Sequence, residues 1–252
     1  MRAPVAAAGA AVVLVLAGCS ATAPPAEGLD GELTVFAAAS LQGAFDAIGE
    51  ELSAQHPGVT VHPTTYDGSA TLATQLVGGA AADVFASADL ETMRAVTDAG
   101  LADGTPTVFT TNSLVIVVAP GNPLGIDSLA DLAALSTSGG TVVLCAVQVP
   151  CGTAAHVVLD GLTLTPVSEE QNVKAVLTKV QTGDADAGLV YRTDVLAAGD
   201  TVEGVEFPEA ATAVNEYPVV VLEDSAVAQA FVDLVLSAEG QQILSELGFT
   251  AP

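Results

Sequence analysis

Short apolar runs alternate with amphipathic patterns along this chain, and the alternation limits the folds that it can adopt. The runs LTVFAA (33–38) and ADVFASAD (82–89) are typical of buried strands. Apolar residues also recur at helical spacing in segments 41–52, 69–79 and 90–100, and the last two of these end in glycine. Repetition of strand and helix in this order predicts an α/β fold with doubly wound, mostly parallel sheets.

A second unit with the same alternation begins at the apolar run SLVIVVAP (113–120). Further strand patterns follow at TVVLCAV (141–147), AGLVY (187–191) and AVNEYPVVVL (213–222). In the first unit, VTVHPTT (59–65) also resembles a strand, near an end or an edge because it contains a proline. Helical patterns separate these runs, so the second unit is predicted to be another α/β layer.

The chain is expected to return to the first unit at its end, because two helical patterns follow the last long strand. We therefore predict two lobes, one formed by 31–111 plus 216–252 and the other by 112–215. Two extended crossings, near 109–114 and 212–217, would join them. Ligands of open α/β sheets bind at the carboxyl ends of strands, so the cleft between the lobes is the predicted site.

The N-terminus has the pattern of a secretory signal peptide over residues 1–18. Arg2 supplies the positive start and AVVLVLAG (11–18) the apolar run, which is too short to span a membrane. Cys19 follows at once, and LAGC resembles a bacterial lipobox, which implies cleavage before Cys19 and a lipid on its sulfur. Residues 19–30 would then be a tether to the outer face of the cell membrane. An ordinary signal peptide with an incidental cysteine is the alternative.

The charge balance excludes nucleic acid as a partner. Asp and Glu number 30 against 5 Lys and Arg, a formal net charge of −25, which becomes −26 when Arg2 leaves with the signal peptide. Nucleic-acid and anionic-membrane surfaces both require a basic footprint, which this chain lacks. Acidity by itself indicates only a well-solvated surface.

Cysteine usage points to an oxidising compartment. Apart from Cys19, the chain has Cys145 and Cys151, with five residues between them. Outside the cytoplasm such a pair can persist as a disulfide, which is the expectation here. Two free thiols, one of them buried in a strand, are the alternative.

Five residues at predicted strand ends or helix starts offer donors of hydrogen bonds without carrying a positive charge. They are Ser40, Ser69, Cys151, Val173 and Tyr191. The first turn of a helix has unpaired N–H groups and a positive partial charge, so several such turns together can bind an anion without a cation. Taken singly, each serine is more often a helix cap or turn residue, and the tyrosine more often packs at a strand end with its hydroxyl satisfied.

The motifs that contain these residues resemble the molybdate-binding proteins of ABC transporters, in the same order over nearly the whole mature chain. They are VFAAASL (35–41), GSATLATQL (68–76), ADVFASAD (82–89), VPCGTAA (149–155), NVKAVLTKVQTGDADAGLVYRTDV (172–195), EYPVVVL (216–222) and LGFT (247–250). The resemblance implies a two-lobed fold like that of periplasmic binding proteins. It also implies that the protein is a monomer that captures molybdate, and tungstate as well, and hands it to a membrane permease.

The same resemblance implies a role for each residue of the site. Hydroxyls would come from Ser40, Ser69 and Tyr191, and backbone N–H groups from Cys151 and Val173. The family commonly has alanine where Cys151 stands, which a backbone donor tolerates. No cofactor and no free metal ion are expected.

Asp67, the identity of the ligand and a possible enzymatic role give rise to further expectations. Asp67, beside the second serine, is expected to face solvent. A carboxylate in the site would repel a dianion, or would accept a proton from a protonated anion such as hydrogen phosphate. Another tetrahedral oxyanion such as sulfate or phosphate is the alternative ligand. An enzyme with Cys151 as nucleophile and His156 as base is disfavoured, because positions five apart do not share a helix face. The histidines, at 56, 62 and 156, also lack the spacing of a metal site.

Overall fold

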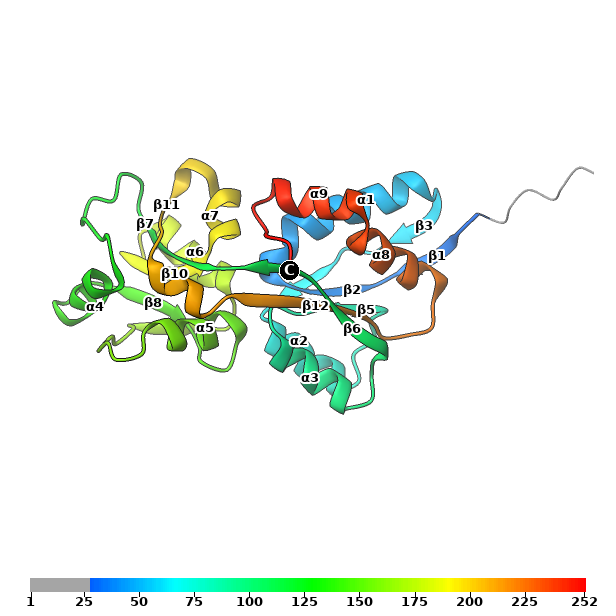
Figure 1. Cartoon of the computed structure of the whole chain (residues 1–252), viewed down its shortest axis with the longest axis horizontal. Coiled ribbons are helices and arrows are strands. Elements are labelled where there is room, and N and C mark those ends of the chain that lie inside the picture. The colour runs from blue at the N-terminus through cyan, green and yellow to red at the C-terminus, as the bar shows by residue number, and fades with distance from the viewer. Residues whose placement is uncertain (1–27) are drawn as a thin grey trace, which may run out of the picture.

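The computed structural model describes residues 28–252, so the predicted signal peptide and Cys19 lie outside the described part. Figure 1 shows two α/β lobes side by side, connected by extended segments near the middle of the molecule. Each lobe is built on one five-stranded sheet, and the two sheets are separate. Within 28–252, no helix is both long enough and apolar enough to cross a bilayer.

The sheet of the first lobe has the strand order β4-β2-β5-β12-β6. Its strands are β2 (Val35–Ala38), β4 (Thr65–Asp67), β5 (Val84–Ala86), β6 (Asp103–Asn112) and β12 (Asn215–Val221). Around it lie the helices α1 (Gln42–Gln55), α2 (Ser69–Val77), α3 (Leu90–Asp98), α8 (Ala226–Leu236) and α9 (Ala238–Glu246). Figure 1 shows α1, α8 and α9 on one side of the sheet and α2 and α3 on the other. Two clusters of buried apolar side chains form the cores on these two sides.

The sheet of the second lobe has the strand order β11-β7-β10-β8-β9. Its strands are β7 (Leu114–Val118), β8 (Val142–Cys145), β9 (Ser168–Glu170), β10 (Ala187–Tyr191) and β11 (Glu203–Val205). Its helices are α4 (Leu129–Thr137), α5 (Pro150–Val158), α6 (Val173–Thr182) and α7 (Arg192–Ala198), with short 3-10 turns η2 (Gly199–Thr201) and η3 (Pro208–Thr212). Every residue of β7 and β10 is buried, as expected for strands covered on both faces.

One strand in each sheet runs against the other four. In the first lobe β12 pairs antiparallel with both β5 and β6. In the second lobe β7 pairs antiparallel with both β10 and β11. The predicted α/β fold with two sheets of mostly parallel strands is therefore confirmed. The chain leaves the first sheet at the end of β6 and returns to it through β12, so its two crossings lie next to each other.

The segment predicted as one strand at 59–65 is two strands, and the prediction was wrong there. Strand β3 (Gly58–Val61) pairs with β1 (Asp30–Leu33) in a small separate sheet, whereas β4 belongs to the main sheet. Pro63 lies between them and has no N–H to donate to a ladder, which explains the interruption. Strand β1 begins at Asp30, the last residue of the predicted tether.

Candidate anion-binding site

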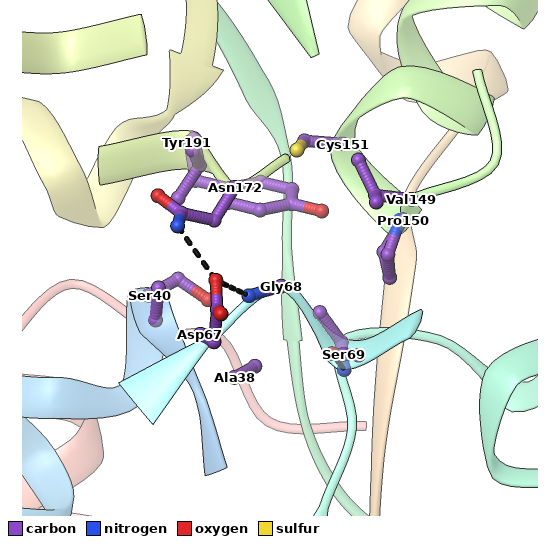
Figure 2. A pocket seen from close by; sticks show the side chains of 13 residues that line it. Ala38, Ser40, Asp67, Gly68, Ser69, Val149, Pro150, Cys151, Asn172 and Tyr191 are labelled. Atoms are coloured by element: carbon purple, nitrogen blue, oxygen red, sulfur yellow. Dashed lines mark hydrogen bonds between the residues drawn. The ribbon is translucent and has the colours of Figure 1, made fainter. Parts of the chain in front are cut away.

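All five residues singled out from the sequence line one cavity between the lobes. The cavity holds about 230 Å³ of empty space, part of it open to solvent. A water-sized sphere can occupy only about 20 Å³ of that space, little more than a single water requires, so the cavity suits a small ion and not a drug-sized ligand. Its lining, drawn in Figure 2, consists of Ala38, Ala39, Ser40, Asp67, Gly68, Ser69, Ala88, Val149, Pro150, Cys151, Asn172, Val173 and Tyr191.

The first lobe contributes two buried serine hydroxyls. Ser40 lies in the 3-10 turn η1 (Ala39–Leu41), directly after β2, and Ser69 is the first residue of α2, directly after β4. Neither side chain makes a capping hydrogen bond, so the alternative that these serines only cap helices is wrong. Ser69 Oγ instead accepts from the N–H of Ala88 at 3.0 Å, which leaves its own O–H to donate.

The second lobe contributes the starts of two helices. Helix α5 begins at Pro150, so Cys151 is its second residue, and α6 begins at Val173. The first four N–H groups of a helix have no intrahelical partner, and the N-terminal ends of α5 and α6 each carry a positive partial charge. The cavity therefore faces backbone donors from Cys151 and Val173 in addition to the hydroxyls of the first lobe.

The hydroxyl of Tyr191 is the group in this site that most needs a ligand. Tyr191 ends β10 and is 1% exposed. Within the described chain its Oη is buried and has no hydrogen-bond partner. An unsatisfied buried hydroxyl costs about 1–3 kcal/mol, which a bound acceptor would recover. Burial, with Tyr217 and nearby carboxylates adding to it, raises the pKa of Tyr191 well above its ordinary value, so the phenol stays protonated and has a proton to donate to a bound acceptor.

No cationic side chain lines the cavity among residues 28–252. Lys174 follows Val173 in α6, but its Nζ lies 2.9 Å from a carboxylate oxygen of Asp194, which is fully buried. Burial raises the pKa of Asp194, and the ion pair with Lys174 opposes that shift. The carboxylate of Asp194 also accepts the backbone N–H of Tyr191 at 3.2 Å. The pair therefore neutralises the lysine and ties the start of α6 to the end of β10.

The expectation that Asp67 faces solvent was wrong, because this residue lines the cavity. Its Oδ1 accepts the N–H of Gly68 at 2.7 Å and the side-chain amide of Asn172 at 2.8 Å, the two bonds drawn in Figure 2. Asn172 belongs to the second lobe, where it also caps α6 by accepting the N–H of Ala175. Asp67 is thus held by two donors, one of them across the seam between the lobes.

The two lobes approach each other closely at Gly68, a contact that the sequence did not predict. A Cβ at this position would lie 2.0 Å from the carbonyl oxygen of Gln171 in the second lobe. No side-chain atom fits at that distance. The signal in the sequence was a glycine directly before a serine of the site, but its interlobe contact depends on residues 103 positions away.

Cys145 and Cys151 are joined by a disulfide, with their Cα atoms 5.7 Å apart. The bond links the end of β8 to the first turn of α5 and so fixes the loop that presents the N–H of Cys151. The same loop is tight at Gly152, where a Cβ would lie 1.9 Å from the carbonyl oxygen of Ala146. In the part of the chain that the structure describes, no group of three or more potential metal ligands occurs.

Comparison with known proteins agrees with this architecture. The family model "Bacterial extracellular solute-binding protein" matches residues 33–250. The chain is 49% identical over 253 residues to the molybdate-binding protein ModA of Mycobacterium tuberculosis, covering 96% of this chain and 95% of that protein.

Among solved structures, the periplasmic molybdate-binding protein of Azotobacter vinelandii matches with a TM-score of 0.74 at 22% identity, covering 87% of this chain and 99% of that one. The sulfate-binding protein SubI of M. tuberculosis matches with a TM-score of 0.73 at 19% identity, covering 86% of each chain. At these identities the two structures establish the fold alone. The predicted resemblance to molybdate-binding proteins is confirmed by the ModA relative, and the chain belongs to the bacterial extracellular solute-binding proteins.

Proposed function

We propose that this protein captures molybdate, and also tungstate, in the cavity between its lobes and delivers it to an ABC permease. The observation that carries the proposal is the buried Tyr191 hydroxyl, which has no partner among the described residues and shares a cavity with unpaired helix N–H groups. A fully deprotonated oxyanion accepts hydrogen bonds at every oxygen. The five candidate groups, Ser40, Ser69, Cys151, Val173 and Tyr191, can each donate one.

Neutral donors are sufficient for such a guest. A hydrogen bond to a charged acceptor contributes about 1.5–3 kcal/mol, and closure of the lobes around the ion excludes water and strengthens each bond. The many surface carboxylates are screened beyond roughly 8 Å at physiological ionic strength, so nearby dipoles outweigh them. Among the described residues, the carboxylate that lines the cavity is that of Asp67, and its Oδ1 already accepts from two donors.

Sulfate is the main alternative ligand, because it has the same charge and shape as molybdate and differs in size. The fold does not distinguish a molybdate-binding from a sulfate-binding protein, since a sulfate-binding protein shares it at a TM-score of 0.73. Molybdate is favoured by the 49% identity to a relative named for that ligand. Phosphate stays a second alternative, because Asp67 lines the cavity and its carboxylate could accept the proton of a hydrogen phosphate. The identity to a relative named for molybdate favours molybdate over phosphate as well.

The remaining parts of the proposal concern location and assembly. Extracytoplasmic substrate binding follows from the family, and we propose in addition that a lipid on Cys19 anchors a monomer to the membrane, with residues after Cys19 as the tether. An enzymatic role has little support, since the sulfur of Cys151 is in a disulfide and not available as a thiolate. No cofactor is proposed.

A thermal-shift series tests the ligand directly. The mature protein is heated alone and with molybdate, tungstate, sulfate or phosphate. At a ligand concentration 100 times the dissociation constant, binding adds about 2.7 kcal/mol to the unfolding free energy. For a domain of this size that corresponds to a rise of roughly 5–11 °C in the melting temperature.

The matched variant carries Ser40→Ala together with Ser69→Ala. It should stay folded but melt below the wild type without ligand, because the N–H of Ala88 and the hydroxyl of Tyr217 lose their partners, and it should lose most of the rise with molybdate. A clear rise with sulfate and none with molybdate would transfer the proposal to sulfate, and an unchanged rise in the double variant would remove both serines from the site.

A further inference from the structure

The hydroxyl of Tyr217 is not part of the cavity lining but contacts Ser40, which is. Tyr217, in β12, is completely buried, and its Oη lies 2.9 Å from Ser40 Oγ. The two residues are 177 positions apart in the chain. The close contact means that the proton arrangement of one hydroxyl fixes that of the other.

The arrangement of the two protons follows from what each group can do. A tyrosine hydroxyl and a serine hydroxyl each have one proton to donate, and a serine oxygen can also accept. Burial raises the pKa of Tyr217, so this phenol keeps its proton. If Ser40 donated to Tyr217, its only proton would be spent, and an anion in the cavity would face oxygen lone pairs. If Tyr217 donates to Ser40, the serine proton is free for the cavity.

We propose that Tyr217 is a positioning residue for the anion, which donates to Ser40 Oγ and so makes the serine a donor toward the bound oxyanion. The inference rests on the proposed function, because only an acceptor in the cavity gives the serine proton a destination. Accepting one hydrogen bond also polarises the serine O–H and strengthens the bond that it donates. Tyr217 therefore acts on affinity without touching the ligand.

The surroundings of Tyr217 make its hydroxyl removable without loss of packing. Its ring meets Tyr191 edge-on with centroids 6.0 Å apart, and meets Phe249 edge-on at 5.7 Å. A phenylalanine keeps both ring contacts and deletes one oxygen. The side chains of Asn112 and Tyr191 also lie close to this hydroxyl, so Tyr217→Phe must be combined with a change at Ser40 to assign its effect to the bond between the two.

A double-mutant cycle separates positioning from a merely structural effect. Dissociation constants for molybdate are measured by calorimetry for the wild type, Tyr217→Phe, Ser40→Ala and the double variant. We expect Tyr217→Phe to weaken binding about 3- to 10-fold, the equivalent of one neutral hydrogen bond. In the Ser40→Ala background the same change should have almost no further effect, because its target is gone.

Tyr66→Phe is the matched control. This phenol, in β4 of the same lobe, donates to Asp46 Oδ1 at 2.8 Å and to the carbonyl oxygen of Gln42, outside the cavity. The chemical change is identical, and molybdate affinity should stay at the wild-type value. Weakening of the same size as in Tyr217→Phe would mean that phenol loss acts through general stability, which would overturn the proposal.

Other outcomes also decide the matter. If wild type binds molybdate and Tyr217→Phe binds it equally well, or if the two losses are additive in the cycle, the positioning role is refuted while the proposed function stands. If the wild type binds no oxyanion, both fall together.

Should Tyr217→Phe not fold, the hydroxyl proton of Tyr217 can be followed by NMR in ring-labelled protein with Ser40 intact and with Ser40→Ala. Protection from exchange that depends on Ser40 supports the bond as drawn, and protection that is indifferent to Ser40 refutes it.

Discussion

Gly68→Ala should leave the protein folded and yet block closure of the cavity. The backbone of Gly68 has φ −59° and ψ 131°, a conformation that alanine adopts freely. Replacing glycine where the backbone permits it stabilises a protein by about 0.4–1 kcal/mol through the unfolded state. The first lobe should therefore be unharmed by the substitution. What does not fit is the new methyl group against the second lobe.

The size of the effect follows from one distance. The Cβ would lie 2.0 Å from the carbonyl oxygen of Gln171, and real Cβ contacts stay beyond 3.0 Å, so the lobes must move at least 1.0 Å apart here. The bond from Asn172 to Asp67 would lengthen from 2.8 Å to about 3.8 Å, past the roughly 3.2 Å limit of a hydrogen bond. Donors of the second lobe would recede from the ion by a similar amount. Loss of even one charge-assisted bond, about 1.5–3 kcal/mol, weakens binding roughly 10- to 150-fold.

The assay is calorimetric titration with molybdate, paired with melting curves of the ligand-free protein. Gly43→Ala is the matched control, because this glycine is exposed in α1 and its Cβ would meet only Leu247 at an ordinary 3.8 Å. The control should bind as the wild type does. Wild-type affinity in Gly68→Ala would refute the reasoning, because it would mean that binding does not need the lobes this close. Loss of the Asn172–Asp67 bond would by itself lower the melting temperature of the ligand-free protein somewhat. Failure of the variant to fold would contradict the claim that the first lobe tolerates the methyl group.

Two further predictions concern stability. Replacing both Cys145 and Cys151 by alanine should lower the free energy of unfolding by about 2 kcal/mol, the loop-closure value for so short a loop. Molybdate affinity should stay within a few-fold of the wild type, because the proposed contact is a backbone N–H. Loss of binding in calorimetry would instead show that the disulfide holds that N–H in place. Asp186 should stabilise the fold in a pH-dependent way. Hydrogen bonds from the backbone and side chain of Thr141 lower the pKa of its carboxyl group. Its contribution to stability is therefore complete above the unfolded pKa near 3.8 and is lost as pH falls through the lower folded pKa. Urea unfolding of wild type and Asp186→Asn should therefore differ most at neutral pH and converge below pH 3.8, and a difference independent of pH would exclude this role.

The fold and the composition of the site were accessible from the sequence because both follow from local rules. Apolar runs such as SLVIVVAP have the length and composition of buried strands, and one of them became the fully buried β7. Strand ends in parallel sheets gather on one edge, so Ser40 and Ser69 could be placed together in the first lobe. Tyr191 ends a strand of the second sheet, and the expected cleft between two lobes was what brought it to the same site. Hydroxyls and helix starts were then enough to suggest an anion.

The contacts that cross between distant segments were not accessible in this way. Asp67 was expected to avoid the cavity on grounds of charge, but two donors, one of them Asn172 of the other lobe, compensate its carboxylate. Tyr217 was part of a recognised motif, but nothing local indicated that its hydroxyl meets Ser40. The break at Pro63 shows the same limit, since the partner of each short strand is chosen by tertiary pairing.

The division of donors between the lobes explains how a small ion could drive closure. On the proposed function, Ser40 and Ser69 would hold the ion in the first lobe, while Cys151, Val173 and Tyr191 would reach it only when the second lobe closes. A ligand shifts a conformational equilibrium only by its difference in affinity for the two states. Three charge-assisted bonds made only in the closed state supply roughly 4.5–9 kcal/mol before costs. A shift from 1:99 to 99:1 requires about 5.5 kcal/mol, which three bonds reach near the lower part of their range, whereas two bonds, at roughly 3–6 kcal/mol, reach it only near the top of theirs.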